Sequence, residues 1–128
     1  YDGSGLSRTN RMTPLFLASV LRSAALDWQT GDLFPTLLPR CGVDGTVRNL
    51  LKGTCLSGNI ALKSGSMTGV RCYAGYYPAE RPHYSVVLLT NNFHCTYEQL
   101  KSSIERLMVG MFESYQDTID KRQNTPQL

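Results

Sequence analysis

The sequence lacks the features of several protein classes. No apolar run approaches the roughly 20 residues of a membrane-spanning helix, so we expect no membrane span. Its 13 Lys and Arg against 10 Asp and Glu give a net charge of only +3. These cations are scattered, so we expect no nucleic-acid partner. With 18% charged and 41% hydrophobic residues among 128, the composition is typical of one globular domain with a core.

Cysteine and histidine are sparse, which removes most metal and redox motifs from consideration. The four cysteines are Cys41, Cys55, Cys72 and Cys95. They form no C-x-x-C pair, and the two histidines add no zinc-ligand spacing, so we expect no metal and no cofactor. Small buried thiols are the simplest interpretation. Four cysteines still allow three pairings, which the sequence leaves open, and Cys41–Cys55 is the first candidate if one bridge forms.

The first half of the chain predicts helices and turns. It opens on Tyr1-Asp2-Gly3 without an initiator Met or a signal peptide, which we interpret as a segment cut from a longer protein. Thr13 and Pro14 are typical of a helix N-cap and first position. Helical spacing then predicts a helix over residues 14–27, broken by Gly31. Its apolar face would be Leu17, Leu21, Ala24 and Trp28.

Residues 31–53 predict shorter helical pieces. The first is a short helix within residues 31–40, buried through Phe34, Leu37 and Leu38 and ended by Pro39. A turn at residues 43–45 precedes one or two helical turns around residues 47–51. Gly53 is a plausible C-cap for them.

From Asn59 the apolar period changes from helical to extended. It predicts strands over residues 59–64, 70–77 and 84–91, with a bend at residues 65–69. Short links favour an antiparallel meander. The segment 84–91 is apolar enough to be covered on both faces, yet it would lie at the edge of the sheet. Because proteins avoid bare apolar edges, we expect it to pair with a strand from elsewhere in the protein or from another copy.

The last third predicts the longest helix. Thr96 and Gln99 have the spacing of a capping box that starts a helix over residues 96–116. Its apolar stripe would be Leu100, Ile104, Leu107, Met108, Met111 and Tyr115. Residues 117–128 form a polar tail that we expect to fray. The predicted fold class is therefore α+β, an antiparallel sheet packed against helices in one domain over residues 1–116.

Two polar segments stand out as candidate sites. Lys63-Ser64-Gly65 places an ammonium and a hydroxyl beside a glycine that lets a ligand backbone approach a strand edge. Ser66 adds a second hydroxyl and an N–H. "DGSGLSR" (residues 2–8) ends in Arg8, which suits carboxylate binding. Each segment alone is equally consistent with an ordinary surface turn. Asp44-Gly45-Thr46 is interpreted as a turn with a cap, and Ser57-Gly58-Asn59 as a chance S-x-N match.

Taken together and in this order, three segments resemble a known family. "DGSGLSRTNRMTP", "LPRCGVDGT" and "LKSGSMTGVRCYAGYY" look like the C-terminal part of D-alanyl-D-alanine carboxypeptidases/endopeptidases, the class C low-molecular-mass penicillin-binding proteins. That family uses the motifs S-x-x-K, S-x-N and K-T-G. Lys63-Ser64-Gly65 corresponds to K-T-G with Ser for Thr, which keeps the hydroxyl. No serine of this sequence begins an S-x-x-K motif.

The resemblance implies a fold, roles and partners. The fold would be like that of penicillin-binding proteins and serine β-lactamases, with a long C-terminal helix on the sheet. Lys63 would organise proton transfer, Ser64 and Ser66 would bind the substrate carboxylate, and the Ser66 N–H would stabilise an oxyanion. Arg8, Met67 and Thr68 would line the pocket for the stem-peptide side chain. Peptidoglycan stem peptides and β-lactams would be the ligands, in the periplasm or cell envelope.

The resemblance also implies a limitation, and it leaves alternatives open. The nucleophile motif would lie upstream of residue 1, so the chain alone is predicted to be inactive. Whether the intact protein prefers carboxypeptidase or endopeptidase activity, and how it oligomerises, stay open. One alternative is a non-catalytic module that kept the fold and lost the chemistry. Another is an unrelated α+β interaction domain in which "DGSG" and "KSG" are only turns.

Overall fold

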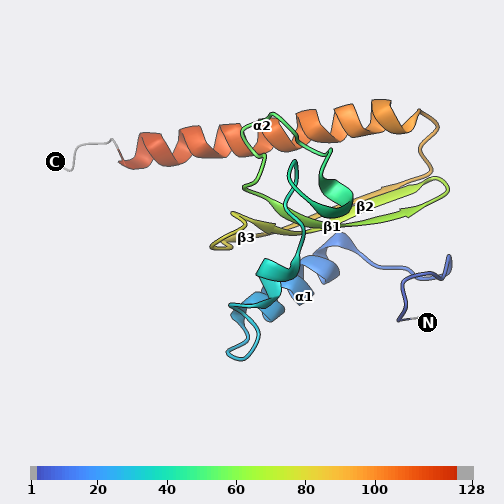
Figure 1. The fold of residues 1–128 in the computed structure, drawn as a ribbon, viewed down its shortest axis with the longest axis horizontal. Coiled ribbons are helices and arrows are strands. Elements are labelled where there is room, and N and C mark those ends of the chain that lie inside the picture. The colour runs from blue at the N-terminus through green and yellow to red at the C-terminus, as the bar shows by residue number, and fades with distance from the viewer. Residues whose placement is uncertain (1–2, 124–128) are drawn as a thin grey trace.

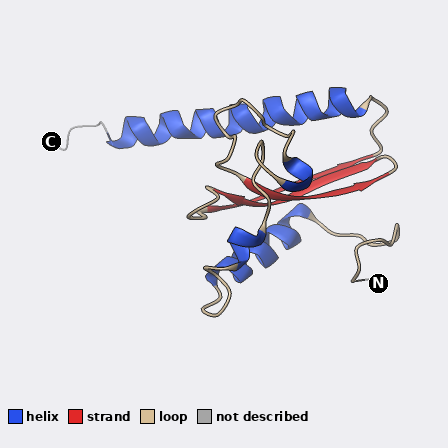
Figure 2. Cartoon of the chain, in the orientation of Figure 1, coloured by secondary structure: helices blue, strands red, loops and turns tan. Residues whose placement is uncertain are grey.

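The computed structural model describes residues 3–123, and side chains as far as residue 113. The helices are α1 (Pro14–Leu26) and α2 (Tyr97–Gln123), with two 3-10 turns, η1 (Phe34–Leu37) and η2 (Gly45–Val47), between them. The strands are β1 (Ala61–Met67), β2 (Val70–Tyr77) and β3 (Tyr84–Asn91). In Figures 1 and 2 the sheet lies between α1 on one face and α2 on the other. The predicted α+β class is confirmed.

Helix α1 begins as its sequence predicts and ends one residue early. Pro14 is the first helical residue, and the Thr13 side chain accepts a hydrogen bond from the Phe16 N–H at 3.2 Å. The helix ends at Leu26 because Asp27 turns extended and its carboxylate accepts N–H bonds from the two residues after Trp28. Trp28 therefore lies beyond the helix and is 88% exposed, so its place in the buried face was wrongly predicted.

The turn η1 lies on the α1 side of the sheet, where Phe34 contacts Tyr76, and residues 41–60 wind over the α2 side in tight turns (Figure 1). Within the predicted short helix, Pro35 is the buried residue, whereas Leu37 is 67% exposed, which corrects the prediction. The turns predicted around residues 47–51 are limited to η2 and the bends after it. Gly53 does adopt the left-handed conformation of a C-cap, with φ of 77°.

The sheet is an antiparallel meander in the order β1-β2-β3. The second and third strands have the predicted bounds, whereas the first was misplaced. It continues through Gly65 to Met67, and only Thr68 and Gly69 form the turn. Gly69 makes this two-residue turn possible with φ of 71°. Lys63-Ser64-Gly65 therefore lies in the middle of a strand and not at its end.

The main core lies between the sheet and α2. Its buried members are Cys41, Val47, Leu50, Leu51, Leu56, Ile60, Leu62, Tyr73, Leu100, Ile104 and Met108. Val86 and Leu88 of β3 pack against this core. On the opposite face, Tyr76 of β2 donates its hydroxyl proton to the Leu21 carbonyl of α1 at 2.7 Å. This bond ties α1 to the sheet.

Helix α2 starts at the predicted capping box. Thr96 N–H donates to the Gln99 side chain at 3.0 Å, and Gln99 N–H donates to the Thr96 hydroxyl at 3.3 Å. The helix continues to Gln123, seven residues past the predicted end, because the polar residues after 116 do not interrupt it. The domain boundary at residue 116 stays a prediction, and residues 124–128 of the predicted tail lie outside the described residues.

The apolar stripe of α2 is narrower than predicted. Leu100, Ile104 and Met108 are buried one turn apart, whereas Leu107 and Met111 are 54% and 61% exposed. Phe112 continues the stripe in their place and packs against Tyr77, with ring centroids 4.2 Å apart. The side chain of Tyr115 lies outside the described residues.

The four cysteines are all free thiols, so the candidate Cys41–Cys55 bridge does not form. Cys41 is fully buried in the core, whereas Cys55 and Cys95 are exposed. Neither α1 nor α2, over the residues that the structure describes, has the length and apolarity of a bilayer-crossing helix.

Candidate functional site at the outer edge of β1

Strand β1 carries the predicted lysine, hydroxyl and glycine cluster along an edge of the sheet. Its inner side pairs with β2, where Ser64 lies opposite Tyr73 and Ser66 lies opposite Arg71. On its outer side the described residues contribute only a single bridge, between Arg40 and Ala61. The stretch from Lys63 to Met67 is therefore the open part of this edge.

The backbone of β1 directs its polar groups outward at alternate residues. Leu62 N–H donates to the Pro39 carbonyl at 3.0 Å, and the Ile60 carbonyl accepts from Cys41 N–H at 2.9 Å, both on the side away from β2. Successive residues of a strand point their N–H and C=O groups to opposite edges. Ser64 and Ser66, two and four residues after Leu62, therefore point theirs to the open edge.

The side chains of this cluster divide between the two faces of the sheet. Lys63 and Gly65 share the α1 face, whereas Ser64 and Ser66 share the α2 face, because side chains alternate along a strand. The exposed Lys63 Nζ donates to the Ser64 carbonyl at 2.9 Å. The hydroxyls of Ser64 and Thr46 form a hydrogen bond at 2.7 Å. Thr46, interpreted from the sequence as part of a turn, therefore orients a predicted site residue.

Gly65 keeps an open space on the strand. Its φ lies outside the left-handed region, so the backbone conformation does not require glycine. A methyl group there would meet only the Cys72 Cβ, at an ordinary 3.7 Å. Gly75 on β2 differs, because a methyl group there would collide with the Ala61 carbonyl. Gly75 is therefore needed for strand packing, and Gly65 is not.

Two phenols hold the guanidinium of Arg71, which lies opposite Ser66 in the β1–β2 ladder. Arg71 donates from Nε to the Tyr73 hydroxyl and from Nη2 to the Tyr97 hydroxyl, each at 2.9 Å. Its guanidinium carbon lies 4.6 Å from the centre of the Tyr97 ring. Burial raises the pKa of Tyr73 to about 12 although the Arg71 charge acts to lower it, so the phenol stays neutral. Sequence reasoning missed this cluster because no motif joins residues 71 and 97.

The structure does not join Arg8 to the rest of the predicted site. Arg8 is exposed on the N-terminal loop, and the hydroxyls of its neighbours Ser7 and Thr9 hydrogen-bond to each other at 2.8 Å. Within residues 3–123, no hydrogen bond or ion pair links Arg8 to Met67 or Thr68. Figure 1 shows the loop and the β1–β2 turn at the same end of the molecule. The side-chain pocket formed by Arg8, Met67 and Thr68 stays a prediction.

The S-x-N match at Ser57-Gly58-Asn59 has a packing explanation. The Ser57 hydroxyl lies tightly against Gly42, where a side chain would collide with it. The Asn59 carbonyl accepts a bond from Ala79 N–H at 2.8 Å. These contacts hold loop segments together, in keeping with the interpretation of a chance match.

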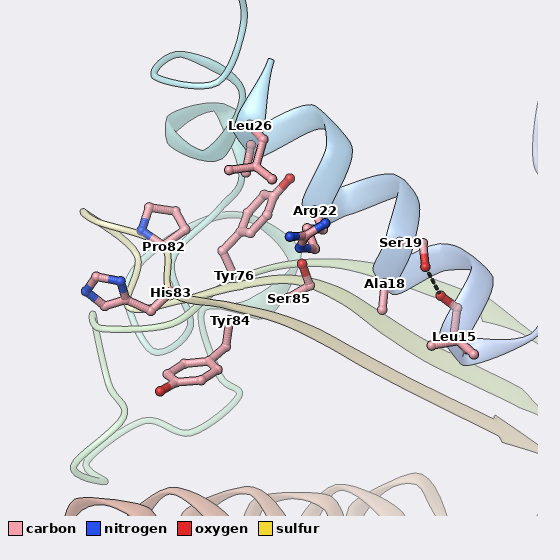
Figure 3. Close-up of a pocket in the computed structure, with 11 residues that line it drawn as sticks. Leu15, Ala18, Ser19, Arg22, Leu26, Tyr76, Pro82, His83, Tyr84 and Ser85 are labelled. Atoms are coloured by element: carbon pink, nitrogen blue, oxygen red, sulfur yellow. Dashed lines mark hydrogen bonds between the residues drawn. The ribbon is translucent and has the colours of Figure 1, made fainter. Parts of the chain in front are cut away.

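A separate pocket of about 370 Å³ lies between α1 and β3 (Figure 3). Arg22 and Leu26 of α1 border it on one side, and His83, Tyr84 and Ser85 on the other. The Ser19 hydroxyl beside it donates to the Leu15 carbonyl at 2.9 Å, within the helix itself. The pocket adjoins the strand opposite β1 in the sheet and contains none of the predicted site residues.

Comparison with known proteins gives a consistent result. The profile of the D-Ala-D-Ala carboxypeptidase 3 (S13) family matches residues 1–114. D-alanyl-D-alanine carboxypeptidase DacB of Haemophilus influenzae is 35% identical over 114 residues, 88% of this chain and 23% of the relative. The D-alanyl-D-alanine carboxypeptidase of Actinomadura sp. is 32% identical over 96 residues, 70% of this chain and 18% of the relative. The chain thus spans about a fifth of these curated relatives.

Solved structures agree with the sequence comparison. The crystal structure of penicillin binding protein 4 (dacB) from H. influenzae superposes with a TM-score of 0.64 at 35% identity, over 74% of this chain and 21% of that one. Its complex with a novel β-lactam gives 0.65 at 29% identity, over 84% and 27%. The predicted resemblance is confirmed, and the chain belongs to the D-Ala-D-Ala carboxypeptidase 3 (S13) family.

Proposed function

We propose that this chain forms one wall of the active site of a serine-type D-Ala-D-Ala carboxypeptidase or endopeptidase. The ligands would be peptidoglycan stem peptides and the penicillins that mimic them. The β-lactam bound to the structural relative supports this ligand class. By the family's chemistry, the intact protein would work in the periplasm or cell envelope.

The outward polar groups of β1 carry the proposal. A peptide that lies along an open strand edge is bound by main-chain hydrogen bonds, and side chains along the strand select it. Ser64 and Ser66 direct their main-chain N–H and C=O groups to that edge. Lys63 precedes Ser64 along the strand, and Gly65 lies between the two serines. An N–H fixed in a strand is already oriented for a developing oxyanion, because it need not reorganise during the reaction. The Ser66 N–H is the candidate donor.

The side chains then have separate roles. Lys63 lies at the edge through its bond to the Ser64 carbonyl, where an ammonium can hold or move a proton. The Ser64 and Ser66 hydroxyls would bind the terminal carboxylate, and Thr46 fixes the Ser64 hydroxyl. The absence of a methyl group at Gly65 leaves room for the ligand backbone. Arg8, Met67 and Thr68 would form the pocket for the stem-peptide side chain.

The chain would require the rest of the protein for chemistry. No serine here begins S-x-x-K, so no acyl-enzyme can form on that motif within the chain. The open outer edge of β3 would pair with a strand from elsewhere in the protein or from another copy. Residues 1–128 are therefore proposed to be inactive alone.

The test is covalent labelling with a fluorescent penicillin, read on a denaturing gel. The full-length gene product that carries this chain should form a labelled band, and the isolated chain should not. Lys63→Ala should slow labelling at least about 100-fold, since a proton-transfer group typically contributes that much. The control, Arg106→Ala, removes an exposed cation on α2 away from the site and should leave labelling unchanged. An unlabelled full-length protein would instead favour a non-catalytic module.

A further inference from the structure

Arg71 is a partly buried cation without an acidic partner in the described part of the chain. The ion pairs found there are Arg40–Glu80 and Lys101–Glu105, and neither involves Arg71. Its hydrogen-bond partners are instead the neutral hydroxyls of Tyr73 and Tyr97. Removing a charge from water is costly unless an opposite charge compensates it. The position of this guanidinium therefore suits an anion supplied by a ligand.

The guanidinium is held in place and still has donors to offer. Its two bonds to the phenols use two of the five N–H groups of an arginine. The Tyr73 and Tyr97 rings lie 5.4 and 4.6 Å from the guanidinium carbon, within the range of cation–π attraction. These contacts fix the charge without neutralising it.

Arg71 lies on the same side of the sheet as the serine hydroxyls. Ser66 and Arg71 are directly opposite in the β1–β2 ladder, so their side chains leave the same face close together. Lys63 projects from the other face. Arg71, and not Lys63, therefore shares a face with the hydroxyls proposed to bind a carboxylate.

A polar hollow adjoins this cluster. A hollow of about 410 Å³ is lined by Thr46, which bonds Ser64, and by Tyr97, which bonds Arg71. Glu98, Lys101 and Glu105 of α2 also line this hollow, whereas Ser64, Ser66 and Arg71 do not, so it adjoins their cluster only through Thr46 and Tyr97.

We propose that Arg71 determines charge specificity at this site. Its guanidinium makes the site favour a ligand with a free terminal carboxylate over the same ligand with a neutral terminus. The inference rests on the proposed function, and adds to it the residue that selects for charge. Tyr73 and Tyr97 are positioning residues that hold the guanidinium beside Ser66.

The test compares two peptides in the full-length protein, one ending in D-Ala-D-Ala with a free carboxylate and the other with the same terminus amidated. Arg71→Gln should raise KM for the carboxylate peptide about tenfold, with kcat within about twofold. Cleavage of the amide should not change. Tyr97→Phe removes one bond to the guanidinium and should give a smaller shift in the same direction. Arg106→Gln, the same change on the exposed face of α2, should have no effect.

The outcomes separate the two proposals. An active wild type whose Arg71→Gln variant discriminates carboxylate from amide as before would overturn the role of Arg71. Equal losses on both peptides would overturn it too, because they indicate a structural role. If Arg71→Gln does not fold, as judged by thermal denaturation, Tyr97→Phe decides by the same comparison. A wild type that cleaves neither peptide and binds no penicillin would overturn the proposed function itself.

Discussion

At the scale of single residues, the two glycines of the β1–β2 ladder differ in what they make possible. Gly75 lies where the Ala61 carbonyl of the neighbouring strand leaves no room for a side chain. Gly65 lies where a side chain would fit, on the strand that carries the candidate site. One glycine allows the strands to pair, and the other leaves space that the protein itself does not fill.

This difference gives opposite expectations for two alanine substitutions. Gly65→Ala should change the free energy of unfolding by less than about 1 kcal/mol, because its methyl group meets no close contact. It should nevertheless slow labelling of the full-length protein by penicillin about tenfold. Gly75→Ala should cost about 1–3 kcal/mol, because the strands must shift. Urea denaturation and gel labelling check both, and a Gly65→Ala protein labelled at the normal rate would contradict the role given to Gly65.

At the scale of elements, α2 buries only some of the apolar residues that its sequence pattern assigned to one stripe. Ile104 is 4% exposed in the core, whereas Leu107, three residues later, faces outward. The structure thus corrects the stripe to residues spaced four apart. Leu107 is 54% exposed and is not among the buried residues of the core.

Substitutions in α2 measure this correction. Ile104→Ala should destabilise the protein by about 2–5 kcal/mol, the cost of a cavity in a packed core. Leu107→Ala, the matched control on the same helix, should change stability by less than about 1 kcal/mol. Thermal or urea denaturation of the two variants gives the comparison. Equal losses would show that Leu107 is covered in the folded protein.

The elements also show what could be predicted locally. Strands β2 and β3 were predicted with their observed bounds because valines, leucines and tyrosines alternate along them without interruption. The start of α1 followed from Thr13 and Pro14 alone. Strand β1 was misplaced because Gly65 was interpreted as a bend, although an extended glycine can continue a strand. Local signals cannot reveal which glycine bends, since pairing with the neighbouring strand decides it.

At the scale of the whole molecule, buried ionisable groups link folding to pH. Burial, and next the charge of Asp44, raise the pKa of Cys41 from 9.0 to about 12. Burial likewise raises the pKa of Tyr73 from 10.0 to about 12. Both groups keep their protons in the folded state at pH values where the unfolded chain has lost them.

The sign of the effect follows from this difference. The stabilisation is complete below about pH 9 and is lost as pH rises towards 12, because only the unfolded state releases protons in that window. Stability should therefore fall by roughly 1 kcal/mol for each pH unit above 9 for the thiol alone. Urea denaturation at pH 8 and pH 10.5 measures it. Cys41→Ala should remove the thiol's share, and an unchanged slope in that variant would contradict the assignment.

The whole molecule also explains why only part of the site was predictable. The order of three motifs along the chain predicted Lys63–Ser66 as the candidate wall. The bonds Thr46–Ser64 and Arg71–Tyr97 span 18 and 26 residues, and they depend on how η2 and α2 lie over the sheet. The spacing of these residues in the sequence does not predict their contacts. The roles of Thr46 and Tyr97 in orienting Ser64 and Arg71 therefore become evident only in the folded chain.

The two-residue turn at Thr68 and Gly69 has a consequence for the open edge. It pairs Met67 with Val70, and the Gly69 carbonyl is held by the Asn92 N–H at 2.7 Å. An odd change in the length of this hairpin would exchange the two sets of main-chain groups, and Ser66 would turn its N–H towards β2. An even change would preserve them. Whether the number of residues in this turn is odd or even therefore decides which main-chain groups of β1 face the open edge.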